Sequence, residues 1–345
     1  MSATGLLGKH WRVLIVGAGS IGQRHLRTFR ATERATVGIC EASSAVCKKV
    51  AEQYQVAEAF DDVDRALAAG WDAAVVCTPA DTHIPLARRA AEAGLHLFIE
   101  KPLSTSTEGV AELAELVRRQ GLKAAVAYVY RVHPLLTAMR TMVISGELGR
   151  PVEVVVVSGH DFAAARPDYR DIYFARRETG GGAIQDALTH LVNAMEWLVG
   201  PVTRVSADCA RQRLEGITAE DTAHLIARHG DILASYSLNQ YQPATEITLT
   251  VVCERGMLRC DLHENRWRWV KTGGTWQDFA MYALDRDVWF TAQATQFLDV
   301  LDGQAEPLCS LADGWQTLRV NLAALHSADH GSIPIDVSNF EQDHA

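Results

Sequence analysis

The stretch VLIVGAGSIG, at residues 13–22, constrains the fold of this chain more than any other part of the sequence. Its first four residues are apolar and predict a short strand that is buried on both faces. Three glycines follow in the spacing G-x-G-x-x-G, at Gly17, Gly19 and Gly22, and the residues behind them predict a helix. The glycines permit a tight turn, close approach of a pyrophosphate, and close packing of the helix on the strand. Because the N–H groups at the helix start favour negative charge, this loop, with Ser20 and Ile21, predicts a dinucleotide site.

A second predicted strand, over residues 36–40, favours the dinucleotide interpretation over an ordinary glycine turn. It ends in Glu41, nineteen residues after Gly22. An acid at this place accepts hydrogen bonds from the adenosine ribose, and its charge repels the extra phosphate of NADP. No arginine or lysine follows Glu41 before Lys48, so we expect NAD to be preferred to NADP.

The size and charge of the chain exclude several other classes of protein. Its 345 residues are enough for two domains, and 48% hydrophobic and 22% charged residues are ordinary for a globular protein. A formal net charge of -9 disfavours nucleic acid as a partner. The seven cysteines lack metal-ligand spacing, and no apolar run is long enough to cross a membrane. We therefore expect a cytoplasmic protein without a metal site.

Strands and helices alternate from residue 36 to residue 127. Further strands are predicted over residues 56–60, 72–77, 95–99 and 123–127, with helices between them. This rhythm is typical of a parallel, doubly wound sheet, whose ligands bind at the carboxyl ends of the strands. The residues that follow each strand are therefore the first candidates for a site.

Two of these strand ends carry groups that suit a cofactor or a reaction. One is Cys77-Thr78-Pro79 with His83 nearby, and the other is Glu100-Lys101-Pro102. Because side chains alternate faces along an extended chain, Glu100 and Lys101 should point in opposite directions. One of them can then hold the scaffold while the other enters a cleft. A solvated ion pair at the end of a strand fits the same pattern.

The pattern changes after residue 127, and we place the domain boundary there, with residues 1–128 in the first domain and 129–345 in the second. Residues 160–178 have little periodicity but many hydrogen-bonding groups, among them His160, Tyr169 and Arg170. A long polar loop in a compact enzyme is often a binding loop or a lid. A plain surface loop is the alternative.

Gly180-Gly181-Gly182 opens a helix that is predicted over residues 183–199. At about 100° per residue, one stripe of this helix is apolar, and the opposite stripe carries Asp186, His190, Asn193 and Trp197. These four residues form either a solvated face or a functional one, and the tryptophan argues against full exposure. The glycines also let another backbone or a ligand approach the start of the helix.

The rest of the second domain predicts a large open sheet. Strand-like runs from residue 202 to residue 271 are joined by short turns, as in an antiparallel meander with helices on one face. We expect a homo-oligomer, a dimer or a tetramer, to bury the other face. Two closing helices show apolar stripes: Phe290, Ala294, Phe297, Leu298 and Leu301 in one, and Leu311, Trp315, Leu318, Leu322 and Leu325 in the other.

Together these motifs resemble the glucose–fructose oxidoreductase / inositol dehydrogenase / MocA family over nearly the whole chain. The glycine loop is common to many folds, whereas the E-K-P motif combined with the G-G-G…D…H helix is specific. The resemblance implies an α/β fold with an N-terminal Rossmann domain that binds NAD. An α+β domain with a large open, mostly antiparallel sheet would follow it. It also implies NAD(P)-dependent oxidation or reduction of a sugar, cyclitol or related polyol.

The resemblance also assigns roles to residues of this sequence. Lys101 and His190 correspond to a proton-transfer pair, and Asp186 to a residue that binds substrate or steers His190. The cofactor side would include Thr78, Pro79, His83, Glu100 and Lys101. The substrate side would include Lys101, Arg131, His160, Tyr169, Arg170, Asp186, His190 and Asn193. The chain departs from the family pattern at Val129, where asparagine is frequent, and at Asn193, where aspartate is frequent.

This chemistry needs a base and a cation, because a hydride leaves a carbinol carbon only as the hydroxyl proton is taken up. His190 can be the base, oriented by Asp186, while Lys101 stabilises the developing oxyanion; alternatively Lys101 is the base. The cofactor carries the hydride, so no metal is needed. Another possible function is a glycosidase or lyase that retains NAD and oxidises its substrate transiently. A non-catalytic NAD-binding regulator is a third, and the presence of both Lys101 and His190 argues against it.

Overall fold

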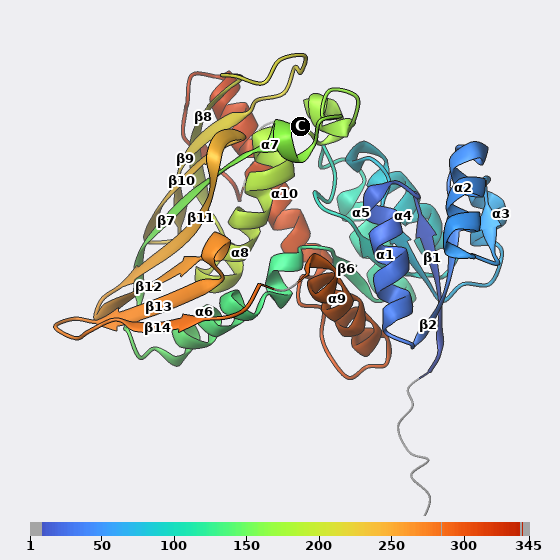
Figure 1. Ribbon diagram of the computed structural model, residues 1–345, viewed down its shortest axis with the longest axis horizontal. Helices are drawn as coiled ribbons and strands as arrows, with labels where there is room; N and C mark the ends of the chain where they lie inside the picture. The colour runs from blue at the N-terminus through green and yellow to red at the C-terminus, as the bar shows by residue number, and fades with distance from the viewer. Residues whose placement is uncertain (1–8, 284, 339, 341–345) are drawn as a thin grey trace, which may run out of the picture. The chain divides into compact units, whose positions relative to one another are not determined.

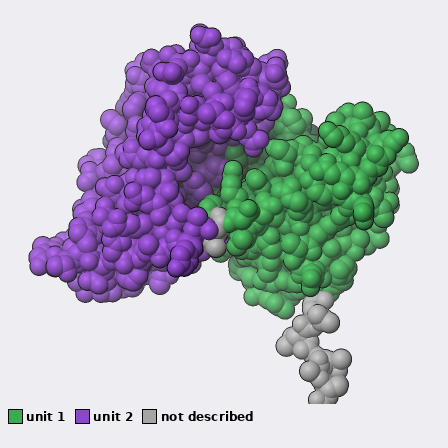
Figure 2. Space-filling view, viewed as in Figure 1, with its two compact units in different colours: residues 1–104, 108–129, 284–312 green, residues 105–107, 130–283, 313–345 purple. Residues whose placement is uncertain are grey.

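The computed structural model describes residues 9–283, 285–338 and 340, and the chain divides into two compact units (Figure 2). The first unit contains residues 1–104, 108–129 and 284–312, and the second contains residues 105–107, 130–283 and 313–345. The segment 108–129 of the first unit thus ends next to the boundary predicted at residue 128. The units differ from that prediction in two segments: residues 284–312 belong to the first unit, and residues 105–107 belong to the second.

A six-stranded parallel sheet forms the centre of the first unit, as the alternation of strands and helices predicted (Figure 1). Its strands are β1 (Trp11–Val16), β2 (Ala35–Cys40), β3 (Ala59–Phe60), β4 (Ala73–Val76), β5 (His96–Ile99) and β6 (Ala124–Val126). Their order is β3-β2-β1-β4-β5-β6, so the winding reverses between β1 and β4. The loops that follow β1 and β4 therefore lie at the switch point where such sheets bind ligands.

The helices of the first unit are α1 (Ser20–Ala31), α2 (Ser44–Tyr54), α3 (Val63–Leu67), η1 (Ala80–Thr82), α4 (His83–Glu92), α5 (Val110–Gln120) and α9 (Arg286–Leu301). Some of them, α2 and α3 among them, begin at a residue whose side chain caps the helix. The side chain of Ser43 accepts the N–H of Val46 at the start of α2, and Asp62 accepts the N–H of Arg65 at the start of α3. These bonds satisfy backbone donors that the helices leave open.

Helix α9 packs in the first unit although it lies close to the end of the chain. Phe297 and Leu298 join Phe29 of α1 in one apolar core. Arg34 forms an ion pair with Asp302, which follows α9, at 2.9 Å. The apolar stripe of this helix is buried, as predicted, but periodicity does not indicate which of two cores a helix joins.

A nine-stranded, mostly antiparallel sheet forms the second unit. Its strands are β7 (Pro151–Asp161), β8 (Arg204–Ala210), β9 (Thr222–His229), β10 (Ile232–Asn239), β11 (Tyr241–Cys253), β12 (Gly256–Asp261), β13 (Arg266–Lys271), β14 (Gln277–Ala280) and β15 (Ile335–Asp336). Their order is β14-β13-β12-β11-β7-β10-β9-β8-β15. The expectation of a simple meander is wrong, because β7 inserts between β11 and β10 and runs parallel to β10. The sequence also failed to predict β14 and β15.

Three helices cover one face of this sheet (Figure 1). They are α6 (Pro134–Ser145), α8 (Thr189–Val199) and α10 (Leu311–Asp329). Met139 of α6 and Leu191 and Met195 of α8 pack in one core with Val154 and Leu249 of the sheet. The shorter segments are η2 (Val129–Val132), α7 (Phe162–Ala165), η3 (Tyr173–Ala175), η4 (Arg177–Thr179), η5 (Ala183–Leu188) and η6 (Leu262–Glu264).

The helix predicted over residues 183–199 consists of two segments of different geometry. The first, η5, is π-helical, and α8 continues it as an α-helix. A π-helical turn contains more residues than an α-helical turn, so one helical wheel cannot place the side chains of both segments. The apolar side is buried, since Ile184 and Leu188 are at most 1% exposed. The opposite side is not a solvated face, because Asn193 is also only 1% exposed.

Helix α10 buries a more polar face than its leucine pattern predicts. Thr317, Asn321 and Ser327 are as deeply buried as Leu318. The Asn321 amide donates to the hydroxyl of Thr189 on α8 at 2.9 Å. Polar contacts as well as apolar ones therefore join these two helices.

Within the described residues, no helix is both long and apolar enough to cross a lipid bilayer. The same part of the chain holds no group of three or more His, Cys, Asp or Glu side chains arranged for a metal ion. The seven cysteines are free thiols.

Candidate cofactor and proton-transfer sites

The glycine loop between β1 and α1 is shaped by close backbone contacts. A Cβ on Gly17 would lie 2.9 Å from the backbone of Cys77, and one on Gly22 would lie 1.9 Å from the Gly17 carbonyl oxygen. A Cβ on Gly19 would meet nothing within 4 Å. Gly19 is also the N-cap of α1 and has no side chain to satisfy the first N–H groups of the helix. An open space at a helix start fits a pyrophosphate.

Glu41 lies against this loop at the end of β2. Its Oε2 accepts the N–H of Ala18 at 2.9 Å, and its Oε1 accepts the N–H of Ser43 at 3.0 Å. The carboxylate is therefore held beside the glycine loop, as an acid that binds the adenosine ribose would be.

The loop after β4 is tied to the loop after β5 by His83. The ring of His83 is 1% exposed, and its Nε2 and Nδ1 lie 2.8 and 2.9 Å from the carbonyl oxygens of Thr78 and Pro102. Burial lowers the pKa of His83, against the opposing effect of these carbonyls. The Thr78 hydroxyl accepts a hydrogen bond of 2.7 Å from Thr82. Three residues were predicted to lie near the cofactor here. His83 links the two loops through its ring, whereas Thr78 and Pro79 lie in the loop that follows β4.

Glu100 and Lys101 have different surroundings, as their alternation along the chain predicted. Glu100 is 5% exposed, whereas Lys101 is half-buried. Glu100 Oε1 lies 2.6 Å from Nε2 of His25 on α1, and its Oε2 accepts the N–H of Lys101 at 2.9 Å. Burial raises the pKa of Glu100, but His25 and Lys101 lower it by a larger amount, so the pKa of this carboxyl is below its ordinary value. Sequence reasoning missed His25, although it lies on the predicted helix directly behind the glycine loop.

Two of the three glycines before η5, Gly181 and Gly182, lie too close to other atoms of the second unit to carry a side chain. A Cβ on Gly181 would lie 2.2 Å from the carbonyl oxygen of Phe174. Gly182 has a φ of +91°, and its Cβ would lie 2.6 Å from Oε1 of Glu220. That buried carboxylate also accepts the N–H of Ile184 at 3.0 Å. The sequence left open whether another backbone or a ligand approaches these glycines. In the structure, other segments of the chain approach them.

Asp186, on the π-helical segment, gathers two polar side chains. The hydroxyl of Tyr173 donates to Asp186 Oδ1 at 2.6 Å. Burial lowers the pKa of His160 below its ordinary value, and the nearby charges of Asp186 and Asp161 oppose this only in part. The sequence analysis assigned His160 and Asp186 to the site and counted Tyr173 only among the polar groups of the loop, because a loop with two tyrosines does not show which one faces the helix.

Tyr169 and Arg170, predicted to bind substrate, have other contacts in the structure. Tyr169 is 3% exposed, and its hydroxyl donates to the carbonyl of Glu215 at 3.0 Å. The Nε of Arg170 donates to the same carbonyl at 3.0 Å, and its guanidinium lies 4.5 Å from the Tyr169 ring centroid. Together they hold the segment around Glu215, and the structure does not bring them to Asp186.

His190 follows Asp186 by four residues and lies in the first turn of α8. Its ring centroid is 5.3 Å from that of Tyr130, with the planes tilted by 41°. The side chain is half-buried. It therefore combines partial exposure with an aromatic neighbour that limits its orientation.

Arg131 and Asn193 lie in the interior of the second unit, at 4% and 1% exposure. Arg131 Nε donates to Asn193 Oδ1 at 2.8 Å, and Asn193 Nδ2 lies 2.9 Å from the hydroxyl of Thr317. That hydroxyl donates to Glu196 Oε2 at 2.6 Å. Burial raises the pKa of Glu196, which the bonds from Thr317 and Gln316 only partly oppose. This network joins α8 to α10, so the structure gives two predicted substrate ligands a framework position.

Two family models match most of the chain. Residues 11–128 match the oxidoreductase family with an NAD-binding Rossmann fold, and residues 136–259 match the GFO/IDH/MocA C-terminal domain. The chain belongs to the GFO/IDH/MocA oxidoreductase family, and its residues 11–128 form the NAD-binding Rossmann domain of that family.

Several relatives carry names of dehydrogenases. An inositol 2-dehydrogenase of Rhizobium meliloti is 31% identical over 187 residues, which are 54% of this chain and 54% of that protein. A D-xylose 1-dehydrogenase (NADP(+)) of Haloferax volcanii is 28% identical over 60% of this chain and 65% of its own length. The chain thus matches between about half and two thirds of the length of these relatives. An inositol 2-dehydrogenase of Corynebacterium glutamicum is 25% identical over 96% of this chain and 98% of its own.

Solved structures share the fold of the whole chain. Levoglucosan dehydrogenase in complex with NADH and levoglucosan has a TM-score of 0.86 at 18% identity, over 95% of this chain and 99% of that one. The WlbA dehydrogenase of Bordetella pertussis, in complex with NADH and UDP-GlcNAcA, has a TM-score of 0.81 at 24% identity, over 95% and 98%. At such identities the likeness establishes the fold alone.

Proposed function

We propose that this protein is an NAD-dependent dehydrogenase. It transfers a hydride between nicotinamide and the CH–OH or carbonyl carbon of a sugar, cyclitol or related polyol. The observation that carries the proposal is the position of Lys101, two residues after the end of β5, a strand of the sheet that also carries the glycine loop. A cation at the carboxyl edge of this sheet suits a reaction in which oxyanion charge develops. The relatives named as inositol and xylose dehydrogenases support the substrate class.

Three features of the first unit fit the cofactor. The open space beside Gly19 suits the pyrophosphate, Glu41 suits the adenosine ribose, and the loop at Thr78 and Pro79 follows the neighbouring strand β4. Bound NAD would supply the hydride acceptor. Because hydrogen bonds hold the Glu41 carboxylate beside the loop, its charge disfavours the extra phosphate of NADP.

The side chains of the protein manage the proton and orient the substrate. We assign Lys101 and His190 to proton transfer and to stabilisation of the oxyanion, with either one as the base. Asp186 binds a substrate hydroxyl or orients His190. His160 and Tyr173, which gather near Asp186, add donors and acceptors that suit the neighbouring hydroxyls of a polyol. We assign framework roles to the other predicted site residues: His83, Glu100, Arg131, Tyr169, Arg170 and Asn193.

We also propose that the protein is a cytoplasmic homo-oligomer that buries the open face of the nine-stranded sheet. Ile226 of β9 is 68% exposed and Leu233 of the adjacent β10 is 49% exposed, whereas their inward-facing neighbours are buried. Free thiols fit a reducing compartment. Sedimentation at micromolar concentration should show at least a dimer, and Ile226→Lys should weaken it. A wild-type monomer at that concentration would contradict the oligomer.

The experiment that tests the function is a panel of sugars and inositols, each with NAD and with NADP, followed through the absorbance of the reduced nicotinamide. At least one polyol should reduce NAD, and NADP should be used less well. Glu41→Ala, combined with an arginine introduced nearby, should reduce the preference for NAD over NADP. A cofactor that copurifies without turnover, together with cleavage of a glycoside, would replace this proposal with the NAD-retaining glycosidase or lyase. Failure to bind NAD would overturn it.

A further inference from the structure

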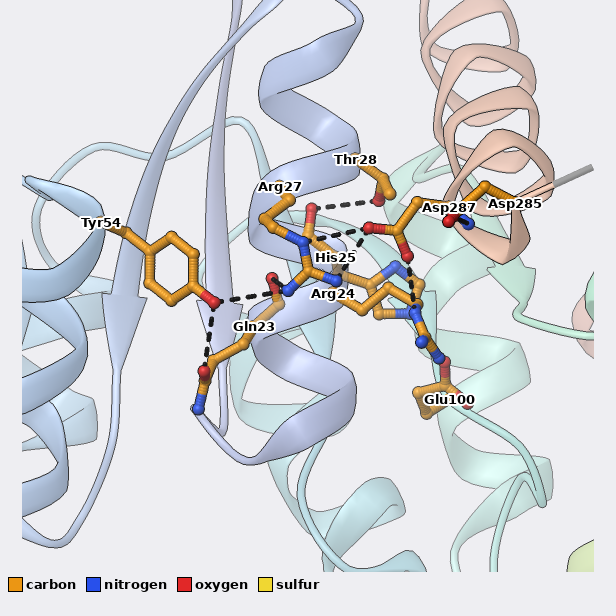
Figure 3. Close-up of polar contacts among 9 residues, drawn as sticks. All are labelled: Gln23, Arg24, His25, Arg27, Thr28, Tyr54, Glu100, Asp285 and Asp287. Atoms are coloured by element: carbon orange, nitrogen blue, oxygen red, sulfur yellow. Dashed lines mark hydrogen bonds and ion pairs between the residues drawn. The ribbon is translucent and has the colours of Figure 1, made fainter. Parts of the chain in front are cut away.

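One buried carboxylate, that of Glu100, which Figure 3 labels together with His25, ties the backbone of Lys101 to helix α1. His25, on α1, is fully buried, and its Nε2 lies 2.6 Å from Oε1 of Glu100. The second oxygen of that carboxylate, Oε2, accepts the N–H of Lys101 at 2.9 Å. Both oxygens of Glu100 are thus occupied, one by α1 and one by the residue proposed to act in proton transfer.

The surroundings of His25 leave Glu100 as the group that orients the imidazole. Its ring packs edge-on against the rings of Phe98 and Phe290, with centroid distances of 5.5 and 5.6 Å, and the centroid of the Phe29 ring is 6.3 Å away. Its Nδ1 has no hydrogen-bond partner among the described residues. The imidazole therefore acts on its polar surroundings through Nε2, as a donor to Glu100.

Packing alone does not account for a histidine at this position. The cage of phenylalanine rings would accept another aromatic ring of similar volume, and buried polar pairs are often no more stabilising than apolar replacements. A phenylalanine would, however, leave Oε1 of Glu100 buried and unpaired. The carboxylate would then be free to turn toward other donors and away from the Lys101 N–H.

We propose that His25 is a positioning residue for Lys101. By holding Oε1 of Glu100, it keeps Oε2 on the Lys101 N–H and so fixes the backbone from which the lysine side chain extends. The inference rests on the proposed role of Lys101. His25 itself neither contacts substrate nor exchanges a proton with it; its effect passes through Glu100.

Two substitutions separate this role from packing. His25→Phe keeps the ring and the volume but removes the donor. His25→Gln places an amide N–H at about the position of Nε2 and restores the donor to Glu100. If His25→Phe does not fold, His25→Asn takes its place, because its shorter amide does not reach Glu100.

The first measurement needs no substrate. The chain has only six lysines, so labelling lysine with ¹⁵N gives a simple amide spectrum; they are Lys9, Lys48, Lys49, Lys101, Lys123 and Lys271. His25→Phe should shift the Lys101 amide and speed its hydrogen exchange by about tenfold or more, while leaving Lys9 and Lys271 unchanged. His25→Gln should resemble the wild type. An unmoved Lys101 amide in His25→Phe would overturn the proposal.

The second measurement is steady-state kinetics. His25→Phe should lower kcat by roughly ten- to a hundredfold, the scale of a misplaced reacting group, with KM for NAD within about twofold. His25→Gln should recover most of the turnover. If folded His25→Gln is as impaired as His25→Phe, the role is one of packing and the proposal fails. If the wild type oxidises no polyol while the Lys101 amide responds as described, the proposed function fails and the positioning role stands.

Discussion

The hydroxyl of Tyr173 donates a hydrogen bond of 2.6 Å to Oδ1 of Asp186. The two residues come from different segments of the second unit, the short turn η3 and the π-helical η5. Tyr173 is 42% exposed, so a ligand can reach this bond from solvent. A hydroxyl and a carboxylate side by side can donate to and accept from neighbouring hydroxyls of a polyol.

Tyr173→Phe should raise KM for the substrate by about fivefold to tenfold, because one hydrogen bond to a charged group is lost from the binding surface. Thermal stability should change little, since the hydroxyl lies at the surface. Tyr169→Phe is the matched control: its buried hydroxyl holds the Glu215 carbonyl, so its loss should lower the free energy of unfolding by about 1 kcal/mol and leave KM unchanged. If Tyr169→Phe raised KM and Tyr173→Phe did not, Tyr169 rather than Tyr173 would be the residue that binds substrate.

Two glycines of one loop should respond differently to alanine. Gly22→Ala places a Cβ 1.9 Å from a backbone oxygen, which cannot move away cheaply, so it should destabilise the protein by more than about 2 kcal/mol. Gly19→Ala meets no protein atom, and its φ of -67° suits alanine, so the fold should be kept. NAD affinity should fall at least about tenfold in Gly19→Ala, because the Cβ enters the space assigned to the pyrophosphate. Thermal unfolding and calorimetric titration with NAD measure both; unchanged NAD binding in Gly19→Ala would place the phosphates elsewhere.

The parts of the fold that could be predicted are those that depend on local sequence. Residues 13–16 of the buried parallel strand β1 form a continuous apolar run, and the spacing of Gly17, Gly19 and Gly22 defines the turn that follows. The order of the second sheet depends on pairing between distant segments. Nothing in the alternation of β7 indicates that it pairs with β10 on one side and β11 on the other. Helix α9 presents the same difficulty, since its apolar stripe would fit either core.

The candidate site shows the same limit at the level of single residues. Glu100 and Lys101 are adjacent in extended chain, where side chains alternate faces, so the sequence predicts different surroundings for the two. Tyr169 and Tyr173 lie in a loop without periodicity, so the sequence does not predict which of them contacts Asp186. Asn193 shares a predicted stripe with His190, yet Arg131 and Thr317 enclose it, and this depends on how other segments pack on α8.

Stability should fall as the pH is lowered, and His133 should cause part of the loss. Its Nδ1 accepts the N–H of Leu135 at the start of α6, and burial lowers the pKa of His133 to about 4. The unfolded chain, with a histidine pKa of about 6.5, binds the proton first, so stability is lost between about pH 6.5 and pH 4, by on the order of 3 kcal/mol. His133→Asn keeps an acceptor for the helix start but does not titrate in this range. Urea unfolding at pH 7 and pH 4 should show a smaller loss in His133→Asn, and an equal loss would exclude His133 as a source.

Lys101→Ala and His190→Ala should each lower turnover by roughly a hundredfold or more, the usual scale for a general acid or base. NAD affinity should change little in either variant, because the glycine loop and Glu41 are left intact. If the two residues act on one proton transfer, the double variant will be much less impaired than the product of the single effects. Asp186→Asn should mainly weaken substrate binding or the orientation of His190. Near-normal turnover in His190→Ala would assign the half-buried side of α8 to the framework, and Lys101 alone would have to carry the proton chemistry.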